Sequence, residues 1–318
     1  MSGRAEPTSA TPAEVRSWME RARRRRRMRQ SGLALLMLSP SLLIFAVFVF
    51  YPFFRNFQLA FYRTPPFPGL PKQWAGLDQI TDVLGSEAFR NSVWVTVKFA
   101  VLTVPTGIAL GLVLAVLAHQ KLRGITVYRT IFSSTVATSV AVASVVFLTL
   151  LNPQIGLVNY YLGREGAQSL LQDPTWALPM VALVTIWQNL GFTFILMSAA
   201  LQAIPDEMLE AAEVDGAGPT RRFFRVTVPL LSPTIFFAFV VGTISAWQAF
   251  GQIDLLTQGG PGGSQGATNT LTYFVYTEFF ERQNEGTAAV LSIALFFIVL
   301  GLTLLQLRYF ERRVHYER

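Results

Sequence analysis

The stretch IPDEMLEAAEVDGAGPTRRFFRVTVP, residues Ile204 to Pro229, lies between two long apolar runs and is richer in charge and glycine than either. Pro205 fits the first turn of a helix, and Asp206 and Glu207 after it suit the positive end of a helix dipole. Apolar residues then recur at three- and four-residue spacing, with glutamates on the opposite side. The stretch therefore predicts a short amphipathic helix that begins near Pro205.

The second half of the stretch predicts a turn and another short helix. The run Gly216-Ala217-Gly218-Pro219 breaks the first helix, and Gly216 allows a close turn that a side chain would obstruct. We expect Thr220 to cap the second helix and Pro229 to open the next apolar run. The second helix carries Arg221, Arg222 and Arg225. We call residues 204–228 the elbow.

Composition places the elbow in a membrane protein. Of 318 residues, 52% are hydrophobic and only 14% are charged, which indicates a polytopic membrane protein. The chain has no cysteine and only two histidines, far apart in sequence, so we expect no disulfide, no metal site and no cofactor. No phosphate-binding loop of the form GxxxxGK[ST] and no catalytic set of side chains is apparent. We therefore do not expect an enzyme, and any ATP hydrolysis would belong to a partner.

Six apolar runs reach the roughly 20 residues that cross a bilayer. Before the first lies a cytoplasmic tail, residues 1–32, with nine arginines. Such a run could bind nucleic acid, but directly before a span it favours anchoring at the cytoplasmic face. The role of the tail otherwise stays open. The predicted spans are Leu33–Phe54, Val93–Ala118, Thr130–Leu151, Ala177–Ala203, Pro229–Phe250 and Thr287–Leu307.

Basic residues set the orientation of these spans. With the N-terminus inside, the cytoplasmic segments hold 19 of the 26 basic residues. Because Lys and Arg concentrate on the cytoplasmic side of membrane proteins, both termini and the elbow are predicted to face the cytoplasm.

Polar residues within the spans are candidates for a solute path, because they tend to face a bundle interior or a water-filled cavity. Lys98 could meet an anionic solute, or it could extend its ammonium group to the membrane interface. Amide and indole groups suit hydroxyl-rich solutes, although they could equally join helices to one another. The candidates besides Lys98 are Trp187, Gln188, Asn189, Thr193, Trp247, Gln248 and Gln252.

The elbow also carries a spacing that resembles the EAA loop of the membrane subunits of bacterial ABC importers. Glu210-Ala211-Ala212 is followed after three residues by Gly216, and Val228-Pro229 closes the pattern. In that family the loop docks on a separate ATPase subunit. The resemblance implies coupling roles for Glu210, Ala211, Ala212, Asp215, Gly216 and Pro229.

The same resemblance implies an all-α, type I importer permease fold with six transmembrane helices over residues 33–318, in the bacterial inner membrane. It also implies a heterodimer with a second homologous permease, two ATP-binding subunits and an extracytoplasmic solute-binding protein. The last external loop, with Gly259, Gly260 and Pro261, would contact that binding protein, or it is a simple flexible turn.

The sequence indicates the substrate less specifically than it indicates the family. The phrases EAAEVDGAGPTRRFF, LTQGGP and VTVKFA resemble the carbohydrate, maltose-type branch, and within it the glycerol 3-phosphate permeases. This implies transport of sn-glycerol 3-phosphate or a related glycerophosphodiester by alternating access, with a sugar or oligosaccharide as the alternative. An ion-coupled secondary transporter is less favoured, because acidic residues within the spans are nearly absent.

Overall fold

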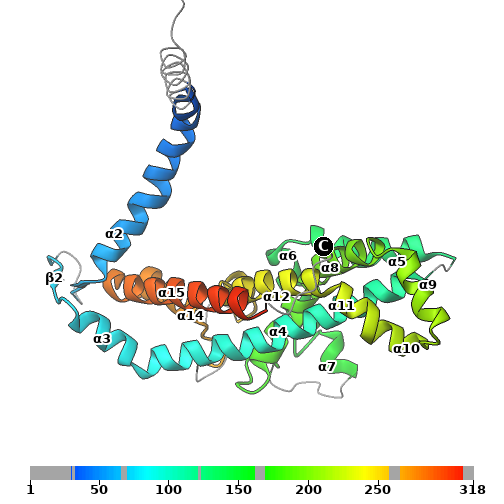
Figure 1. Ribbon diagram of the computed structural model, residues 1–318. Helices are drawn as coiled ribbons and strands as arrows, with labels where there is room; N and C mark the ends of the chain where they lie inside the picture. The colour runs from blue at the N-terminus through cyan, green and yellow to red at the C-terminus, as the bar shows by residue number, and fades with distance from the viewer. Residues whose placement is uncertain are drawn as a thin grey trace, which may run out of the picture. The chain divides into compact units, whose positions relative to one another are not determined.

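A computed structural model describes residue 30 and residues 33–65, 70–120, 123–161, 169–257 and 266–310 of the chain (Figure 1). It divides into two compact units, Met1–Gln58 and Leu59–Arg318. In the first unit, the described residues form most of a 27-residue apolar helix, Leu33–Leu59, which includes η1 (Ala46–Phe50) and α2 (Tyr51–Leu59). Apart from Gln30, the Arg-rich tail lies outside the described residues.

The described residues of the second unit are mostly helical. Its elements are a two-stranded antiparallel hairpin followed by helices. In chain order they are β1 (Tyr62–Arg63), β2 (Gln73–Trp74), α3 (Asp78–Gly85), α4 (Glu87–His119), α5 (Ile125–Ser134), η2 (Thr135–Ala137), α6 (Val140–Leu150), α7 (Leu157–Tyr161), α8 (Ala177–Gln202), α9 (Asp206–Val214), α10 (Pro219–Arg222), η3 (Phe223–Thr227), α11 (Val228–Leu230), α12 (Ser232–Trp247), α13 (Gly251–Leu256), α14 (Leu271–Tyr276), η4 (Thr277–Glu281) and α15 (Glu285–Phe310).

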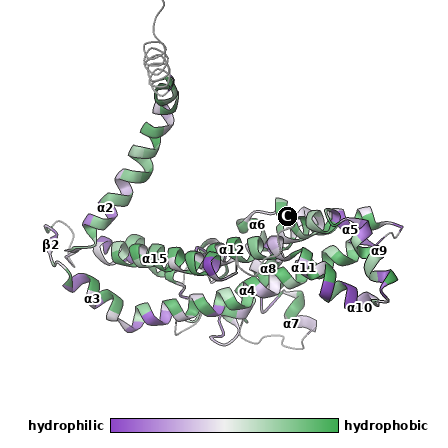
Figure 2. Cartoon of the chain, viewed as in Figure 1, coloured by the Kyte–Doolittle hydropathy of each residue, from purple (hydrophilic) through white to green (hydrophobic). Residues whose placement is uncertain are grey.

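Four helices of the described chain are long and apolar enough to cross a membrane, namely Leu33–Leu59, Glu87–His119, Ala177–Gln202 and Glu285–Tyr309. Figure 2 shows α4, α8 and α15 predominantly in the hydrophobic colour, whereas α9 and α10 carry much of the hydrophilic colour. The prediction of a mostly helical membrane protein is therefore confirmed.

Two predicted spans are bent rather than straight. Helix Ile125–Ala137 meets Val140–Leu150 at 106°, and Pro219–Leu230 meets Ser232–Trp247 at 64°. At the first bend Thr138 is extended, and Ser139 caps α6 by accepting from the Val142 amide at 3.2 Å. At the second bend Pro233 occupies the first turn of α12 and has no amide proton to continue the helix before it.

The helix of the second predicted span begins earlier than predicted. α4 begins at Glu87, six residues before the predicted Val93, because Ser86 caps it with a 3.1 Å bond from the Phe89 amide. Between the fifth and sixth predicted spans, the described residues on either side of 258–265 form α13 and α14.

The largest core of the second unit lies where α4 packs along α8 (Figure 1). Phe99 on α4 and Val181 and Val184 on α8 are fully buried there, and Trp247 at the end of α12 is buried beside them. A separate cluster joins Phe194 and Met197 on α8 to Leu231, directly after the elbow. The long helices therefore hold both a cavity and the elbow in place.

The hairpin and α3 are tied to the start of α15. Lys72 pairs with Glu285 at 2.5 Å, and the Gly286 amide donates to Thr64 Oγ1 at 3.0 Å. A side chain at Gly286 would overlap the carbonyl oxygen of Tyr62, so only glycine permits this approach. Figure 1 shows this end of the second unit opposite the end that carries α9 and α10.

Candidate functional site

The first candidate site is the elbow, and its turn is built as its sequence predicts. α9 ends in a Schellman motif, in which the Gly216 amide donates to Glu213 O and the Ala217 amide donates to Ala212 O, both at 3.0 Å. Gly216 adopts a φ of +76°, which is strained for a residue with a side chain. The chain therefore reverses sharply between α9 and α10.

The start of each elbow helix differs from its prediction by one or two residues. Pro205 precedes α9 in the N-cap position, so that Asp206 and Glu207 form the first turn. The expected cap at Thr220 was wrong. Gly218 is the N-cap of α10 and Pro219 is its first residue, because proline has the backbone angle that a helix start needs.

An ion pair that was not predicted from the sequence joins the two helices on either side of the turn. Arg222 Nη1 on α10 donates to Glu213 Oε2 on α9 at 2.9 Å. The two residues lie nine positions apart, so their side chains would not meet on one continuous helix. Only the turn at Gly216 brings them together.

Most of the surface of α9 is exposed, and only Leu209 and Ala212 within it are half-buried. It has no buried residue, and Glu210, Ala211 and Asp215 face solvent with Gly216. Three apolar side chains are also exposed on the elbow: Met208 at 41%, Phe224 at 64% and Val214 at 88%. Pro229, the last predicted coupling residue, lies half-buried in α11.

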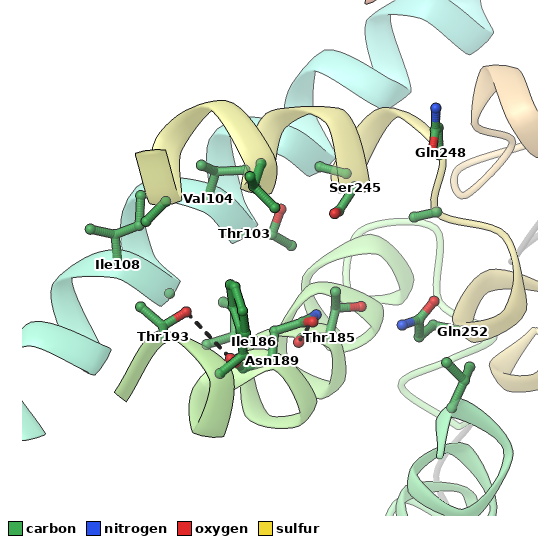
Figure 3. Close-up of a pocket in the computed structure, with 18 of the residues that line it drawn as sticks. Thr103, Val104, Ile108, Thr185, Ile186, Asn189, Thr193, Ser245, Gln248 and Gln252 are labelled. Carbon is green, nitrogen blue, oxygen red and sulfur yellow. Dashed lines mark hydrogen bonds between the residues drawn. The ribbon is translucent and has the colours of Figure 1, made fainter. Parts of the chain in front are cut away.

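The second candidate site is a cavity of about 430 Å³ among α4, α8, α12 and α13 (Figure 3). Figure 3 shows Thr185 and Asn189 on α8 facing Thr103 and Ser245 across it. The seven hydroxyl- or amide-bearing side chains that line the cavity are Thr103, Thr185, Asn189, Thr193, Ser245, Gln248 and Gln252. No Asp, Glu, Lys or Arg of the described chain is among its lining residues.

Four of the predicted path residues line this cavity: Asn189, Thr193, Gln248 and Gln252. Thr185 was missed, although Thr185, Asn189 and Thr193 are spaced by four residues and so share one face of α8. Thr103 and Ser245 were also missed, because nothing in the sequence relates α4 and α12 to α8 at this depth.

The other amide and indole candidates lie behind the cavity wall. Gln188 accepts a 2.8 Å bond from Gln252 Nε2. Trp187 packs edge-on against Phe147 with ring centroids 5.4 Å apart, and Trp247 is only 5% exposed in the core. These two tryptophans pack helices together.

Lys98 lies away from the cavity. Its side chain is on an exposed face of α4, with Nζ 5.9 Å from the centroid of the Trp94 ring. A cation over an indole face is a favourable contact. This position favours the alternative in which the ammonium group extends along the helix surface to an interface.

Aromatic rings bound the cavity toward α14. Phe250, a lining residue, stacks on Tyr273 with ring centroids 6.2 Å apart. Burial, with added effects of Glu281 and Asp254, raises the pKa of Tyr273 to about 12. Tyr273 therefore adds no charge to this boundary at neutral pH.

Two further expectations concern the loop and metals. Gly259, Gly260 and Pro261, predicted to contact a binding protein, lie outside the described residues. Within the described part of the chain, no three His, Asp or Glu side chains are grouped to hold a metal ion.

Long apolar helices, a neutral polar cavity between them and an exposed elbow define a class, the helical membrane permeases. Residues 107–316 match the family described as "Binding-protein-dependent transport system inner membrane component", and the chain belongs to this family. The membership expected from the EAA spacing is thus confirmed, and the chain is a component of an ABC importer.

Curated relatives match nearly the whole chain. The "sn-glycerol-3-phosphate transport system permease protein UgpA" of Agrobacterium fabrum is 38% identical over 283 residues, which is 88% of this chain and 95% of that protein. The protein of the same description from Brucella abortus is 39% identical over 282 residues, again 88% and 95% of the two chains.

A solved structure shares the fold. It is described as the crystal structure of a bacterial ABC transporter involved in the import of the acidic polysaccharide alginate. One of its chains superposes with a TM-score of 0.78 and 23% identity, covering 91% of this chain and 99% of that one. The predicted type I importer permease fold is supported by this likeness.

Proposed function

We propose that this chain is a membrane-spanning permease subunit of an ATP-driven, binding-protein-dependent importer of sn-glycerol 3-phosphate or a related glycerophosphodiester. The observation that carries the substrate is the similarity of nearly the whole chain to proteins named as sn-glycerol 3-phosphate permeases, at 38% and 39% identity. Transport proceeds by alternating access, in which the helices around the cavity open it to either side in turn.

The proposed topology has six spans, counting each bent pair as one. Both termini and the elbow face the cytoplasm of a bacterial cell, and the hairpin end of the second unit faces outward. Supporting this, the excess of arginine and lysine falls on the segments placed inside. The long apolar helices supply the spans.

The proposed partners are a second homologous permease, two ATP-binding subunits and an extracytoplasmic solute-binding protein. ATP hydrolysis belongs to the ATP-binding subunits. The elbow is the surface on which one of them docks, with Glu210, Ala211, Ala212, Asp215, Gly216 and Pro229 as its coupling residues. Exposed Met208, Val214 and Phe224 support this, because solvent-facing apolar side chains on a charged helix suit a protein interface.

The cavity is the proposed part of the solute path in this chain. Its volume of about 430 Å³ falls within the roughly 300 to 1,000 Å³ typical of ligand pockets. Its neutral hydroxyl and amide lining also favours the second candidate, a sugar or oligosaccharide importer. We keep that candidate for this reason alone.

Reconstitution tests the proposal. The chain and its proposed partners, namely the second permease, the ATP-binding subunits and the binding protein, are reconstituted in proteoliposomes with ATP inside. We expect ATP-dependent uptake of labelled sn-glycerol 3-phosphate. If a disaccharide is taken up and stimulates ATP hydrolysis while sn-glycerol 3-phosphate does neither, the substrate is a sugar. Uptake driven by an ion gradient without the ATP-binding subunits would contradict the importer itself.

A further inference from the structure

Three arginines lie on the short helix that leads from the elbow into α12, and only one of them is paired within the described chain. We call this helix, Pro219–Leu230, the entry helix; it comprises α10, η3 and α11 (Figure 1). Arg222 donates to Glu213 on α9, whereas Arg221 and Arg225 are exposed and form no ion pair with the described residues. The entry helix itself contains no acidic residue.

The two unpaired arginines share one side of the entry helix. Residues four apart on a helix are neighbours on its surface, so Arg221 and Arg225 present their guanidinium groups together. Thr227 is buried and Val226 is half-buried, and these residues attach the helix to the rest of the unit. The result is an amphipathic helix with an exposed strip of positive charge.

The bend before α12 sets the level of this strip in the membrane. α12 has 16 residues, which gives a length of about 24 Å. The entry helix is about 18 Å long, but it meets α12 at 64° and so advances only about 8 Å along the α12 axis. With α12 along the membrane normal, the two helices cover about 32 Å, close to the roughly 30 Å of a hydrocarbon core. The start of the entry helix therefore lies at the level of the phospholipid headgroups.

Phospholipid phosphates are the anions available at that level. A guanidinium group matches a phosphate with parallel N–H donors, and an anionic membrane surface attracts basic residues that lie beside it. A protein partner in the cytoplasm meets α9 first, because the entry helix returns from α9 toward the span (Figure 1).

We propose that Arg221 and Arg225 bind the phosphate groups of anionic phospholipids in the cytoplasmic leaflet. The three arginines then divide their roles, since Arg222 holds α9 and the other two hold the entry helix at the membrane surface. This inference rests on the topology of the proposed function, in which the elbow faces the cytoplasm, and adds a lipid-binding site to it.

Lipid photo-crosslinking tests the site in the assembled complex. The complex is reconstituted in phosphatidylcholine vesicles that contain phosphatidylglycerol with a photoreactive diazirine in its headgroup. We expect a lipid adduct on peptides of the entry helix. Arg221→Gln with Arg225→Gln should lower this adduct about ten-fold, because each basic residue near an anionic surface strengthens binding several-fold. Arg221→Lys with Arg225→Lys keeps both charges and should keep most of the adduct.

The matched control removes two other exposed arginines. Arg123→Gln with Arg308→Gln changes the net charge equally but lies outside the elbow, so the adduct on the entry helix should persist. An equal loss in this control would show a general effect of charge and contradict the site. No adduct on the entry helix of the parent, an adduct that the glutamine pair leaves unchanged, or a lysine pair that loses as much as the glutamine pair would each overturn the inference.

Co-purification with the ATP-binding subunits separates a lipid contact from a protein contact. Phe224, which belongs to the proposed docking surface, is intact in every variant, and we expect the glutamine pair to co-purify like the parent. If the glutamine pair loses the ATP-binding subunits while the lipid adduct is unchanged, the two arginines bind protein and not lipid. The crosslinking uses neither solute nor ATP, so its result is independent of whether the proposed substrate is correct.

Discussion

Arg222 Nη1 and Glu213 Oε2, 2.9 Å apart, join the two helices of the elbow across the turn at Gly216. The glutamate side chain is 72% exposed and the arginine 33%, so the pair contributes little to folding, on the order of 1 kcal/mol or less. Its consequence is geometric, because it holds α9 and α10 at one angle. The coupling role that we propose for the elbow requires such stiffness.

Breaking this pair should weaken coupling more than stability. We expect Glu213→Ala or Arg222→Ala to leave assembly intact but to lower solute uptake per ATP hydrolysed about two- to five-fold, since a surface pair of this kind is worth up to about 1 kcal/mol. Uptake and hydrolysis are measured in the same proteoliposomes. The exchanged pair Glu213→Arg with Arg222→Glu should recover part of the loss. If the ratio of uptake to ATP hydrolysis is unchanged in both single variants, the ion pair does not contribute to coupling.

Gly216→Ala should strain the turn without any steric clash. No heavy atom lies within 4 Å of the added methyl group, so the cost is that of the positive φ, about 1 to 2 kcal/mol. We expect weaker association with the ATP-binding subunits, measured by co-purification at increasing detergent. Gly218→Ala is the matched control, because Gly218 has a φ of −61° and equally open space. Equal behaviour of the two variants would contradict a role for the turn.

Gly286→Ala should loosen the link between the hairpin and α15. The methyl group would overlap the Tyr62 carbonyl, so we expect a loss of about 1 to 3 kcal/mol of stability, seen as a lower thermal unfolding midpoint in detergent. Gly301→Ala, on the same helix with nothing within 4 Å, should be neutral or slightly stabilising. If Gly286→Ala unfolds at the same midpoint as the parent, the close contact between Gly286 and the Tyr62 carbonyl does not contribute to stability.

Lys98→Leu should leave the apparent affinity for sn-glycerol 3-phosphate unchanged. Lys98 lies over the Trp94 ring on an exposed face of α4 and does not line the cavity. Uptake is measured as a function of substrate concentration. A selective loss of affinity for the phosphorylated solute, with neutral solutes unaffected, would place Lys98 on the path after all.

The elbow could be predicted in detail because its signals are local. A proline, two acidic residues and a glycine at fixed offsets specify a helix start and a Schellman end, whatever the rest of the chain does. The missed cap at Gly218 belongs to the same kind of signal. Pro219 could have indicated it, since proline favours the first helical position.

The cavity could be predicted only in part, because its walls come from helices distant in sequence. Asn189 and Gln252 were visible as polar residues in apolar runs. Thr103 and Ser245 became recognisable only when α4 and α12 were seen against α8. The 106° bend before α6 was hidden for a related reason, since Thr138 and Ser139 could also occur within a straight span.

The central claim, that the elbow docks on an ATP-binding subunit, is tested most directly by site-specific photo-crosslinking. The chain has no cysteine, so Val214→Cys accepts a maleimide-benzophenone label at a single site of this subunit. Leu77→Cys is the control, because Leu77 is 67% exposed and directly precedes α3, which lies at the opposite end of the second unit from α9 (Figure 1); Val214 is 88% exposed. We predict that the label at position 214 crosslinks to the ATP-binding subunit in assembled membranes and that the label at position 77 does not. No crosslink from position 214, or equal crosslinking from both positions, would contradict the account.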